Sequence, residues 1–332
     1  MEDTNLLEVQ NLSTHFFSRE GTLRAVDGVS FEVKRGETLG IAGESGCGKS
    51  VTAQSIMRLV PANGDIVGGR IMFDLPNTGP TDLVSMDPEG ARMLDIRGRV
   101  ISMIFQEPMT SFSPVHTIGD QLSEVIVIHQ KADKSEARRK AIDFLRRVGM
   151  PKPEQIYDSY PFNLSGGMRQ RAMIAVALSC HPELLIADEP TTAVDVTIQA
   201  LVLDLIAQMQ RQLNMALIMI THDLAVIAEL ADKVCIMYLG KDVEYGPVVD
   251  LFYHPKHPYT QGLLESIPKF GESATQRLTP IAGSVPGPGE IPTGCKFHPR
   301  CAHFMKGVCD KADPPAFDVG DGHRVRCFLY GR

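Results

Sequence analysis

The stretch GESGCGKS constrains this chain more than any other part of the sequence. It follows ETLGIAG, a mostly apolar run typical of a buried strand, and it precedes a segment that can form a helix. Gly43, Gly46 and Gly48 allow a tight turn whose N–H groups, with the positive end of the next helix, surround an anion. The spacing places the Lys49 ammonium near the β- and γ-phosphates of a nucleotide and the Ser50 hydroxyl near Mg²⁺. The sequence therefore predicts a phosphate-binding loop.

Cys47 lies inside this loop, at a position where the backbone does the binding, and its thiol is a candidate oxidation site. The alternative is a glycine-rich turn with a chance lysine, but the order of strand, loop and helix favours the phosphate-binding loop. The residues expected to bind ATP here are Gly43, Glu44, Ser45, Gly46, Cys47, Gly48, Lys49, Ser50 and Val51.

A second apolar run ends in the acids that such a loop requires. ELLIADEP, at residues 183–190, closes on Asp188 and Glu189. Asp188 is expected to hold Mg²⁺, and Glu189 to polarise the water that attacks the γ-phosphate. An ordinary strand that ends in a solvated acidic turn is the alternative. Together with the glycine loop, the acid pair predicts an ATPase that uses Mg²⁺ and ATP.

A third motif, LSGGMRQR at residues 164–171, carries a family resemblance. A serine and paired glycines that open a helix form a second anion-binding terminus, which a single phosphate loop does not need. With this motif the sequence resembles the ATP-binding subunit of an ABC transporter. The resemblance implies that two ATPase domains pair head to tail, and that the signature residues of one close over the partner's ATP. These residues are Ser165, Gly166, Gly167 and Met168, the last standing where the family usually has Gln, which implies a weaker polar contact there.

The resemblance assigns roles to further polar residues. Gln106 in MIFQEP is similar to the family's glutamine that contacts Mg²⁺ and the attacking water, and His222 in IMITHDL to its switch histidine at the γ-phosphate. A lone histidine after a strand is more commonly structural, but its place after the acidic strand favours the switch role. The implied catalytic set is Glu189, His222 and Gln106, and the implied Mg²⁺ ligands are Ser50, Gln106 and Asp188.

Two further assignments also follow from the resemblance. Asp195 in TTAVDV falls where the family places a loop that crosses the dimer. Phe16 in STHFFS is expected to stack on adenine, with Phe17 as the less favoured choice. The two phenylalanines could equally be alternate faces of a half-buried strand.

The resemblance covers residues 6–268 and implies an α/β fold, the ABC-type P-loop NTPase domain. That domain has a mixed core sheet, an antiparallel β subdomain and an α-helical subdomain, here expected at about residues 107–180. Apolar and polar residues alternate over residues 6–35, which predicts antiparallel strands joined by a turn. Apolar recurrence at three and four predicts helices over residues 117–148. Residues 75–98 are rich in turn formers and predict an insertion loop.

Apolar runs that end at Asp188, Thr221 and Leu239 alternate with helical patterns. This alternation is typical of a parallel core sheet covered on both sides. Near residue 280 the sequence becomes rich in proline and glycine and loses periodicity. Residues 269–332 are expected to form a small cysteine-rich C-terminal extension.

Four of the seven cysteines, Cys295, Cys301, Cys309 and Cys327, lie in the last 38 residues. Four thiolates suffice for one tetrahedral metal ion or one cubane cluster, and a segment this poor in apolar residues would gain folding energy from such a centre. The spacing lacks the paired C-x-x-C of structural zinc and leaves iron, zinc, disulfides and free thiols open. His298, His303 and His323 could replace a cysteine as ligand, although surface or outer positions are expected for them.

A closer subgroup is indicated by HPKHPYTQGLLESIP, at residues 254–268, and by these cysteines. Both features resemble the oligopeptide and dipeptide importer ATPases, whose relatives also serve the uptake of nickel, glutathione or oligosaccharides. That subgroup carries a 4Fe-4S cluster in a comparable region, so the resemblance implies a cluster on the four cysteines, with zinc as the alternative. Its role could be that of a structural staple, a redox sensor or a docking patch, and the staple is the default expectation.

Composition limits the partners. The net charge of -7 gives no basic footprint for nucleic acid, and the basic run EARRKAIDFLRR has the spacing of a solvated helix face. The acidic start MEDTNLLE is not a signal peptide, and no run approaches the roughly 18 apolar residues of a spanning helix. Transport must then come from membrane-embedded partners.

The resemblance implies a peripheral subunit at the cytoplasmic face of the inner membrane. Its implied partners are two permease subunits, a second ATPase chain that is often different, and an extracytoplasmic substrate-binding protein. The expected function is to energise the import of peptides. The alternatives are a soluble ABC-class ATPase that acts on nucleic acid or ribosomes, and an importer ATPase with a non-peptide cargo such as nickel or oligosaccharide.

Overall fold

The computed structural model describes residues 5–19, 21–106, 112–191, 196–266, 281–287 and 289–331. The chain divides into two compact units, which are described in turn. Unit 1 comprises Met1–Leu6, Val33–Glu37 and Asp74–Ile220, and unit 2 comprises Leu7–Glu32, Thr38–Phe73 and Thr221–Arg332.

Three short parallel strands form the centre of unit 1. They are β6 (Ile101–Ile104), β7 (Leu184–Asp188) and β8 (Ala216–Ile220), with β7 between the other two. Every residue in the three strands is buried, as expected for parallel strands covered on both faces. Because Ile104 pairs with Ala187 and Asp188 with Ile220, the carboxyl ends of the strands meet at one edge.

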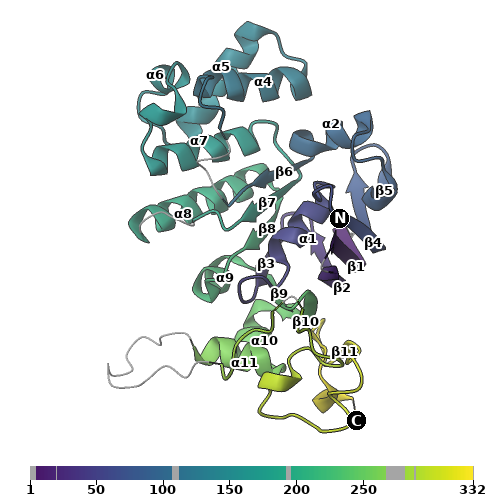
Figure 1. Cartoon of the computed structure of the whole chain (residues 1–332). Helices are drawn as coiled ribbons and strands as arrows, with labels where there is room; N and C mark the ends of the chain where they lie inside the picture. Colours follow the sequence, from purple (N-terminus) through teal and green to yellow (C-terminus); the bar gives the residue numbers. More distant parts are fainter. Residues whose placement is uncertain are drawn as a thin grey trace. The chain divides into compact units, whose positions relative to one another are not determined.

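The helices of unit 1 confirm the periodicity found over residues 117–148. Figure 1 shows α4 (Ile118–Gln130), α5 (Lys134–Arg147), α6 (Pro153–Tyr157) and α7 (Gly166–Leu178) gathered together, and a longer helix, α8 (Val196–Leu213), follows β7 in the chain. Thr117 caps α4 in a reciprocal arrangement with Asp120, which satisfies two backbone N–H groups at the start of the helix.

Residues 75–98 are more regular than the predicted insertion loop. They contain β5 (Gly79–Asp82), a short 3₁₀ turn and most of the helix α2 (Ala91–Arg99), which is kinked at Arg97 and Gly98. The prediction of a loop was wrong because glycine and proline flank the helix closely. Met93 and Ile96, three residues apart and both buried, are the periodic signal within it.

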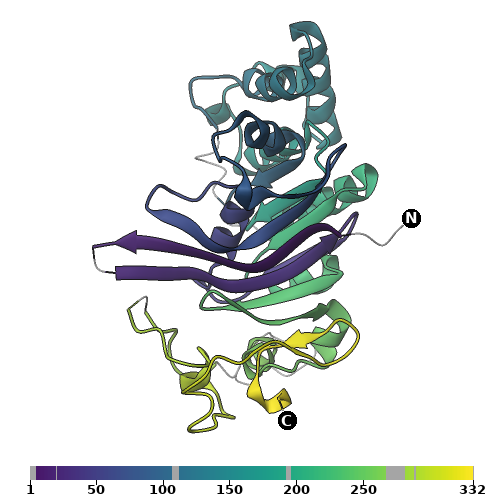
Figure 2. The same cartoon turned by 90° about the vertical axis from the view of Figure 1, so that its right-hand side faces the viewer.

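Unit 2 begins with long antiparallel strands, as predicted for residues 6–35. Figure 2 shows β1 (Asn5–Ser18) and β2 (Gly21–Lys34) side by side. On its other edge β1 pairs with β4 (Gly64–Leu75), where Leu7 faces Phe73.

A second group of strands in unit 2 carries the C-terminal part of the chain. β3 (Thr38–Ala42) lies parallel to β9 (Lys233–Tyr238), which pairs antiparallel with β10 (Lys241–Pro247). β12 (Arg324–Val325) adds to β10, and β11 (Phe317–Asp318) adds to β12. β8 and β9 each end one residue before the predicted Thr221 and Leu239.

Four helices accompany these strands: α1 (Lys49–Ile56), α9 (Leu224–Leu230), α10 (Val248–Tyr253) and α11 (Pro258–Glu265). One core cluster joins Ala42 at the end of β3, Tyr238 on β9, Tyr259 on α11 and Phe297. The chain around residue 297 therefore packs into the same core as the strand before the glycine loop. Each helix within the described residues is too short or too polar to cross a lipid bilayer.

Candidate nucleotide-binding site

The glycine loop lies in unit 2 between β3 and α1, and the surrounding backbone requires glycine at two of its positions. A Cβ atom on Gly43 would stand 2.1 Å from the carbonyl oxygen of Met237, and one on Gly48 would stand 2.3 Å from that of Ala25. Both residues also have a positive φ, 149° and 103°, which side chains of L-residues rarely allow. The loop is thus held against neighbouring backbone in a conformation that only glycine permits.

Lys49 is folded over the loop. Its side chain is buried, and Nζ donates to the carbonyl oxygens of Gly43, at 2.8 Å, and Glu44, at 3.2 Å. An ammonium held in this place can meet phosphate oxygens that enter the loop. Ser50 follows in the first turn of α1 and is half-buried.

Cys47 is buried in the loop, and burial raises the pKa of its thiol. Because the thiolate is the reactive form, this cysteine is less reactive than the predicted oxidation site requires. Its backbone carbonyl accepts the Gly240 N–H at 2.9 Å, in agreement with a position where the backbone does the work.

The aromatic residues expected at adenine lie near the end of β1. Phe16 is half-buried beside Gly64, where an added Cβ would stand 2.7 Å from its ring. Phe17 is 50% exposed, so the two rings lie on alternate faces of the strand. The choice of Phe16 for adenine stays a prediction.

The acid pair stands at the carboxyl edge of the parallel strands in unit 1. Asp188 is buried, whereas Glu189 is half-buried, with a φ of 46° and its N–H bonded to Ile220 O at 2.9 Å. Gln106, two residues after β6, donates from Nε2 to Glu189 Oε2 at 3.1 Å. The structure therefore brings together the glutamine and the glutamate that the sequence assigned to the attacking water.

The signature residues open α7, as predicted. Ser165 is the N-cap, where its Oγ accepts the Met168 N–H at 3.4 Å. Ser165 and Gly166 are exposed, and a Cβ placed on Gly166 would have no described atom within 4 Å beyond its chain neighbours and its own helix backbone. Gln170, one turn further on, donates to Pro190 O, which ties this helix to the turn after the acid pair. An exposed helix N-terminus with this cap can accept an anion.

His222 lies in unit 2, two residues after the last residue of β8. It is exposed, and the Thr221 N–H before it bonds to Ile41 O of the phosphate-loop strand at 3.3 Å. Asp223 after it caps α9 by accepting the Ala225 N–H. His222 is thus held between two fixed residues. Asp195, expected at the dimer loop, lies outside the described residues.

The four C-terminal cysteines approach one another in unit 2. Burial raises the pKa of the Cys295 thiol to about 12, and the charges of Cys309, Cys327 and Cys301 act in the same direction. The Cys295 N–H bonds to Cys309 O at 2.8 Å. No disulfide joins any of the seven cysteines, all of which lie in the described part. Nor do any three His, Cys, Asp or Glu side chains among the described residues form a group that could hold a metal ion.

The three histidines among these cysteines, which were not expected to be metal ligands, differ in their exposure. His298 and His303 are partly or fully exposed, whereas His323 is buried and its Nε2 lies 2.7 Å from Glu244 Oε1. His323 is therefore not at the surface, because it pairs with a buried carboxylate of β10, and the alternative of an outer position beside the cysteines stays a prediction. This pair holds the end of the chain to the sheet.

Two residues at the loop were missed by the sequence analysis. The Tyr259 hydroxyl accepts the Glu44 N–H at 2.9 Å, and Arg300 forms an ion pair with the Glu44 carboxylate at 2.7 Å. Both lie far along the chain from the loop, so no local spacing links them. The sequence offers only weak signals for them: Arg300 is a charged residue beside a cysteine, in HPRC, and Tyr259 is the aromatic residue in HPYT.

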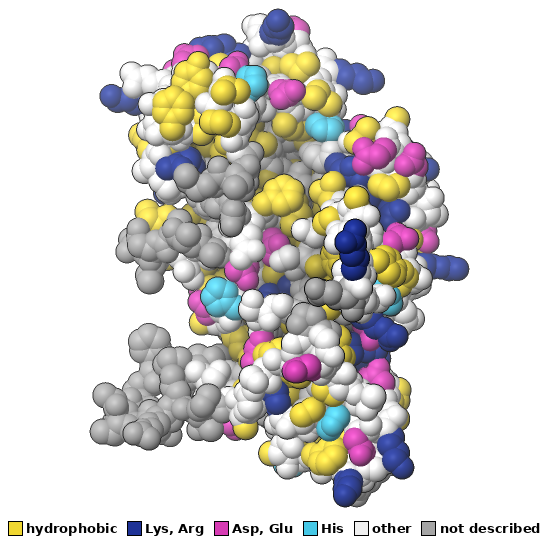
Figure 3. Space-filling view, viewed as in Figure 1, with side chains coloured by type: hydrophobic (Ala, Val, Ile, Leu, Met, Phe, Trp, Pro, Cys, Tyr) yellow, Lys and Arg dark blue, Asp and Glu magenta, His cyan; other side chains and the backbone are white. Residues whose placement is uncertain are grey.

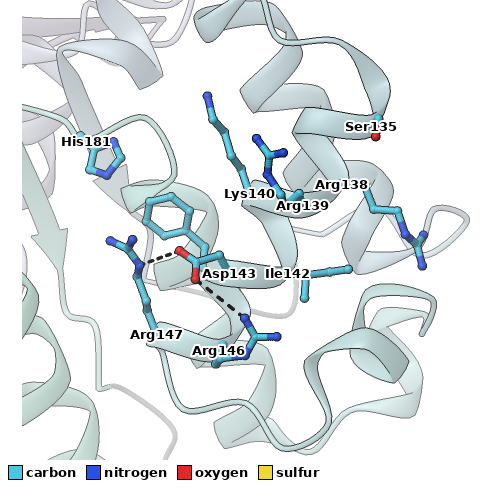
Figure 4. Close-up of a pocket in the computed structure, with 10 residues that line it drawn as sticks. Ser135, Arg138, Arg139, Lys140, Ile142, Asp143, Arg146, Arg147 and His181 are labelled. Atoms are coloured by element: carbon cyan, nitrogen blue, oxygen red, sulfur yellow. Dashed lines mark hydrogen bonds and ion pairs between the residues drawn. The ribbon is translucent and has the colours of Figure 1, made fainter.

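A basic cavity of about 630 Å³ lies on α5 in unit 1 (Figure 4). Its charges are largely paired: Arg147 bonds to Asp143 at 2.8 Å and Arg138 to Asp158 at 3.2 Å. This agrees with the predicted solvated helix face. On the face shown in Figure 3, basic and acidic side chains are likewise interspersed.

The glycine loop follows one strand and the acid pair follows another, and this combination defines the class of P-loop ATPases. Two family profiles match it: "ABC transporter" over residues 26–192, and "Oligopeptide/dipeptide transporter, C-terminal region" over residues 243–309. The chain therefore belongs to the ABC transporter family of ATP-binding proteins.

Relatives match the chain over nearly its whole length. "Oligopeptide transport ATP-binding protein AppD" of Bacillus subtilis (strain 168) is 50% identical over 327 residues, 98% of this chain and 97% of that one. "Dipeptide transport ATP-binding protein DppD" of the same organism is 48% identical over 325 residues, 98% and 94% of the two chains.

Solved structures share the fold. The dimeric ATP-binding cassette MJ0796, bound to ADP and Pi, has a TM-score of 0.64 at 22% identity, over 73% of this chain and 98% of that one. The cbiO1 protein of Clostridium perfringens, part of the ABC transporter complex cbiONQ, has a TM-score of 0.62 at 26% identity, over 75% and 91%. The predicted ABC-type α/β fold is confirmed.

Proposed function

We propose that this chain is the ATP-binding and ATP-hydrolysing subunit of an importer for di- or oligopeptides. The observation that carries this proposal is the near full-length similarity, at 50% and 48% identity, to proteins named for oligopeptide and dipeptide transport. The chain acts as a peripheral subunit at the cytoplasmic face of the inner membrane. Its partners are two permease subunits, a second and homologous ATPase chain, and an extracytoplasmic binding protein.

In this proposal each predicted residue has one task. Lys49 and the N–H groups of the loop bind the β- and γ-phosphates, and Phe16 stacks on adenine. Glu189 orients the attacking water, with Gln106 bonded to its carboxylate. The Mg²⁺ ligands are Ser50, Gln106 and Asp188, and His222 contacts the γ-phosphate.

The remaining residues act across a dimer. Ser165, Gly166, Gly167 and Met168 close over the partner's ATP, and Asp195 lies at the loop between the two ATPase chains. Binding of two ATP molecules brings the chains together, closure drives the permease from one state to the other, and hydrolysis resets the pair.

Uptake of a radiolabelled dipeptide by cells that lack the native gene tests the proposal. Wild-type chain should restore uptake, whereas Lys49→Ala should not. Arg139→Ala, which changes an exposed side chain on α5, is the matched control and should restore uptake fully. Restored uptake of nickel or an oligosaccharide, but of no peptide, would replace the proposed cargo.

We also propose that Cys295, Cys301, Cys309 and Cys327 hold a 4Fe-4S cluster that staples the C-terminal extension. Support comes from the 2.8 Å bond between the Cys295 N–H and Cys309 O, which brings two of the four cysteine backbones together, and from the free state of all four thiols. Four cysteine thiolates are a complete ligand set for such a cluster.

Iron and acid-labile sulfide, measured on chain purified without oxygen, test this cluster. About four of each per chain are expected, and Cys301→Ser should lose them while ATP binding remains measurable. Cys180→Ser, which alters a buried cysteine at the end of α7, should keep them. Iron retained in full by Cys301→Ser would remove that residue from the ligand set.

A further inference from the structure

The C-terminal segment that bears the cysteines also contacts the phosphate-binding loop. Arg300, the residue before Cys301, donates two hydrogen bonds to the Glu44 carboxylate, from Nη1 to Oε2 at 2.7 Å and from Nη2 to Oε1 at 3.1 Å. The Arg300 side chain is only 5% exposed, and that of Glu44 is 26% exposed. Two parallel, charge-assisted bonds in a largely buried place fix both partners more firmly than a surface ion pair does.

Arg300 is itself held by its surroundings. Its Nε donates to Ala282 O at 3.0 Å, and its Nη1 lies 3.4 Å from the Tyr238 hydroxyl. Its guanidinium carbon lies 5.8 Å from the centre of the Tyr238 ring and 5.9 Å from that of Phe297. The arginine is therefore presented to the loop in one orientation.

The backbone of Glu44 is held by the same group of residues. The Tyr259 hydroxyl accepts its N–H, and the Tyr259 ring packs against Tyr238 and Phe297 with centroid distances of 4.7 and 5.3 Å. Both the side chain and the backbone of this loop residue thus depend on contacts with residues 238–300.

Glu44 is the one acid in GESGCGKS, and its backbone carbonyl accepts a hydrogen bond from the Lys49 ammonium. A free carboxylate here would repel the phosphates that the loop binds. A unit charge roughly 10 Å from a phosphate, at an effective dielectric constant of about 20, changes affinity on the order of tenfold. Arg300 cancels this charge.

We propose that Arg300 is a positioning residue of the nucleotide site. By neutralising and fixing Glu44, it sets the affinity of the loop for ATP, and it makes that affinity depend on the folded C-terminal segment. The inference rests on the ATP-binding role of the loop and requires no metal at the cysteines.

Dissociation constants of ATP and ADP for the full chain, measured in EDTA so that no hydrolysis occurs, test the proposal. Arg300→Gln should weaken ATP binding by about tenfold, weaken ADP less because ADP carries less charge, and lose most of the effect in high salt. Arg324→Gln is the matched control, since Arg324 is an arginine of the same extension whose guanidinium carbon lies 4.5 Å from the centre of the Tyr245 ring on β10, and this variant should bind ATP like wild type.

A rescue experiment separates this role from a merely structural one. The double variant Glu44→Gln/Arg300→Gln removes both charges and should bind ATP within about threefold of wild type. ATP binding by the double variant that is as weak as in Arg300→Gln would overturn the proposal. If Arg300→Gln does not fold, Glu44→Gln tests the neutralising role instead. This variant should bind ATP at least as tightly as wild type. A tenfold loss of ATP affinity would refute the neutralising role.

Discussion

At the scale of single residues, the shape of the nucleotide site depends on positions where the surrounding backbone leaves no room for a side chain. Gly43 and Gly48 face carbonyl oxygens at distances that no Cβ can occupy, whereas Gly46 has open space around it. The three positions of this motif therefore require glycine for different physical reasons. Two are required by close approach of backbone, and one by its φ of 77° alone.

Gly43→Ala should consequently weaken ATP binding by at least about tenfold, because the loop must move away from Met237 to admit the methyl group. Gly46→Ala is the control in the same loop and should cost only a few-fold, from backbone strain. Titration with a fluorescent ATP analogue measures both. Equal affinities of Gly43→Ala and wild type would show that the close approach to Met237 does not shape the site.

At the scale of elements, the start of α11 depends on a neutral histidine. His257 is fully buried, its Nδ1 accepts the Tyr259 N–H at 3.0 Å, and its own N–H donates to Glu244 Oε2 at 2.9 Å. Burial lowers the pKa of His257 to about 4. A protonated Nδ1 could no longer accept the N–H that begins the helix, which agrees with the direction of the shift.

This pKa predicts how stability depends on pH. The folded value of about 4 lies below the ordinary 6.5, so the unfolded chain takes up the proton first as pH falls. The contribution of His257 is full above pH 6.5 and is lost progressively as pH falls towards 4, with about 2 kcal/mol gone between pH 7 and pH 5.

Urea unfolding at pH 7 and pH 5 measures this loss. His257→Asn keeps an acceptor for the Tyr259 N–H but cannot titrate, so its stability should fall by about 2 kcal/mol less than that of wild type over the same interval. His254→Asn, a change at an exposed residue just before the helix, should behave like wild type. Parallel pH profiles for wild type and His257→Asn would contradict the assignment.

At the scale of the whole molecule, the sequence predicts motifs made of neighbouring residues but not contacts between residues far apart in the chain. The glycine loop, the acid pair and the signature cap are each written within about eight neighbouring residues, so their chemistry could be predicted. The contact between Glu44 and Arg300 joins residues 256 positions apart, and no periodicity encodes it. The helix α2 was missed for a different reason, since the flanking turn formers outweighed the two buried positions, Met93 and Ile96.

The central claim is that Glu189 activates water for ATP hydrolysis in a pair of such chains. The most direct test compares ATP turnover, ATP affinity and nucleotide-dependent pairing of wild type and Glu189→Gln. The account predicts that turnover falls by about a hundredfold or more, that ATP still binds with nearly wild-type affinity, and that the paired form accumulates with ATP. Undiminished turnover in Glu189→Gln would contradict the account.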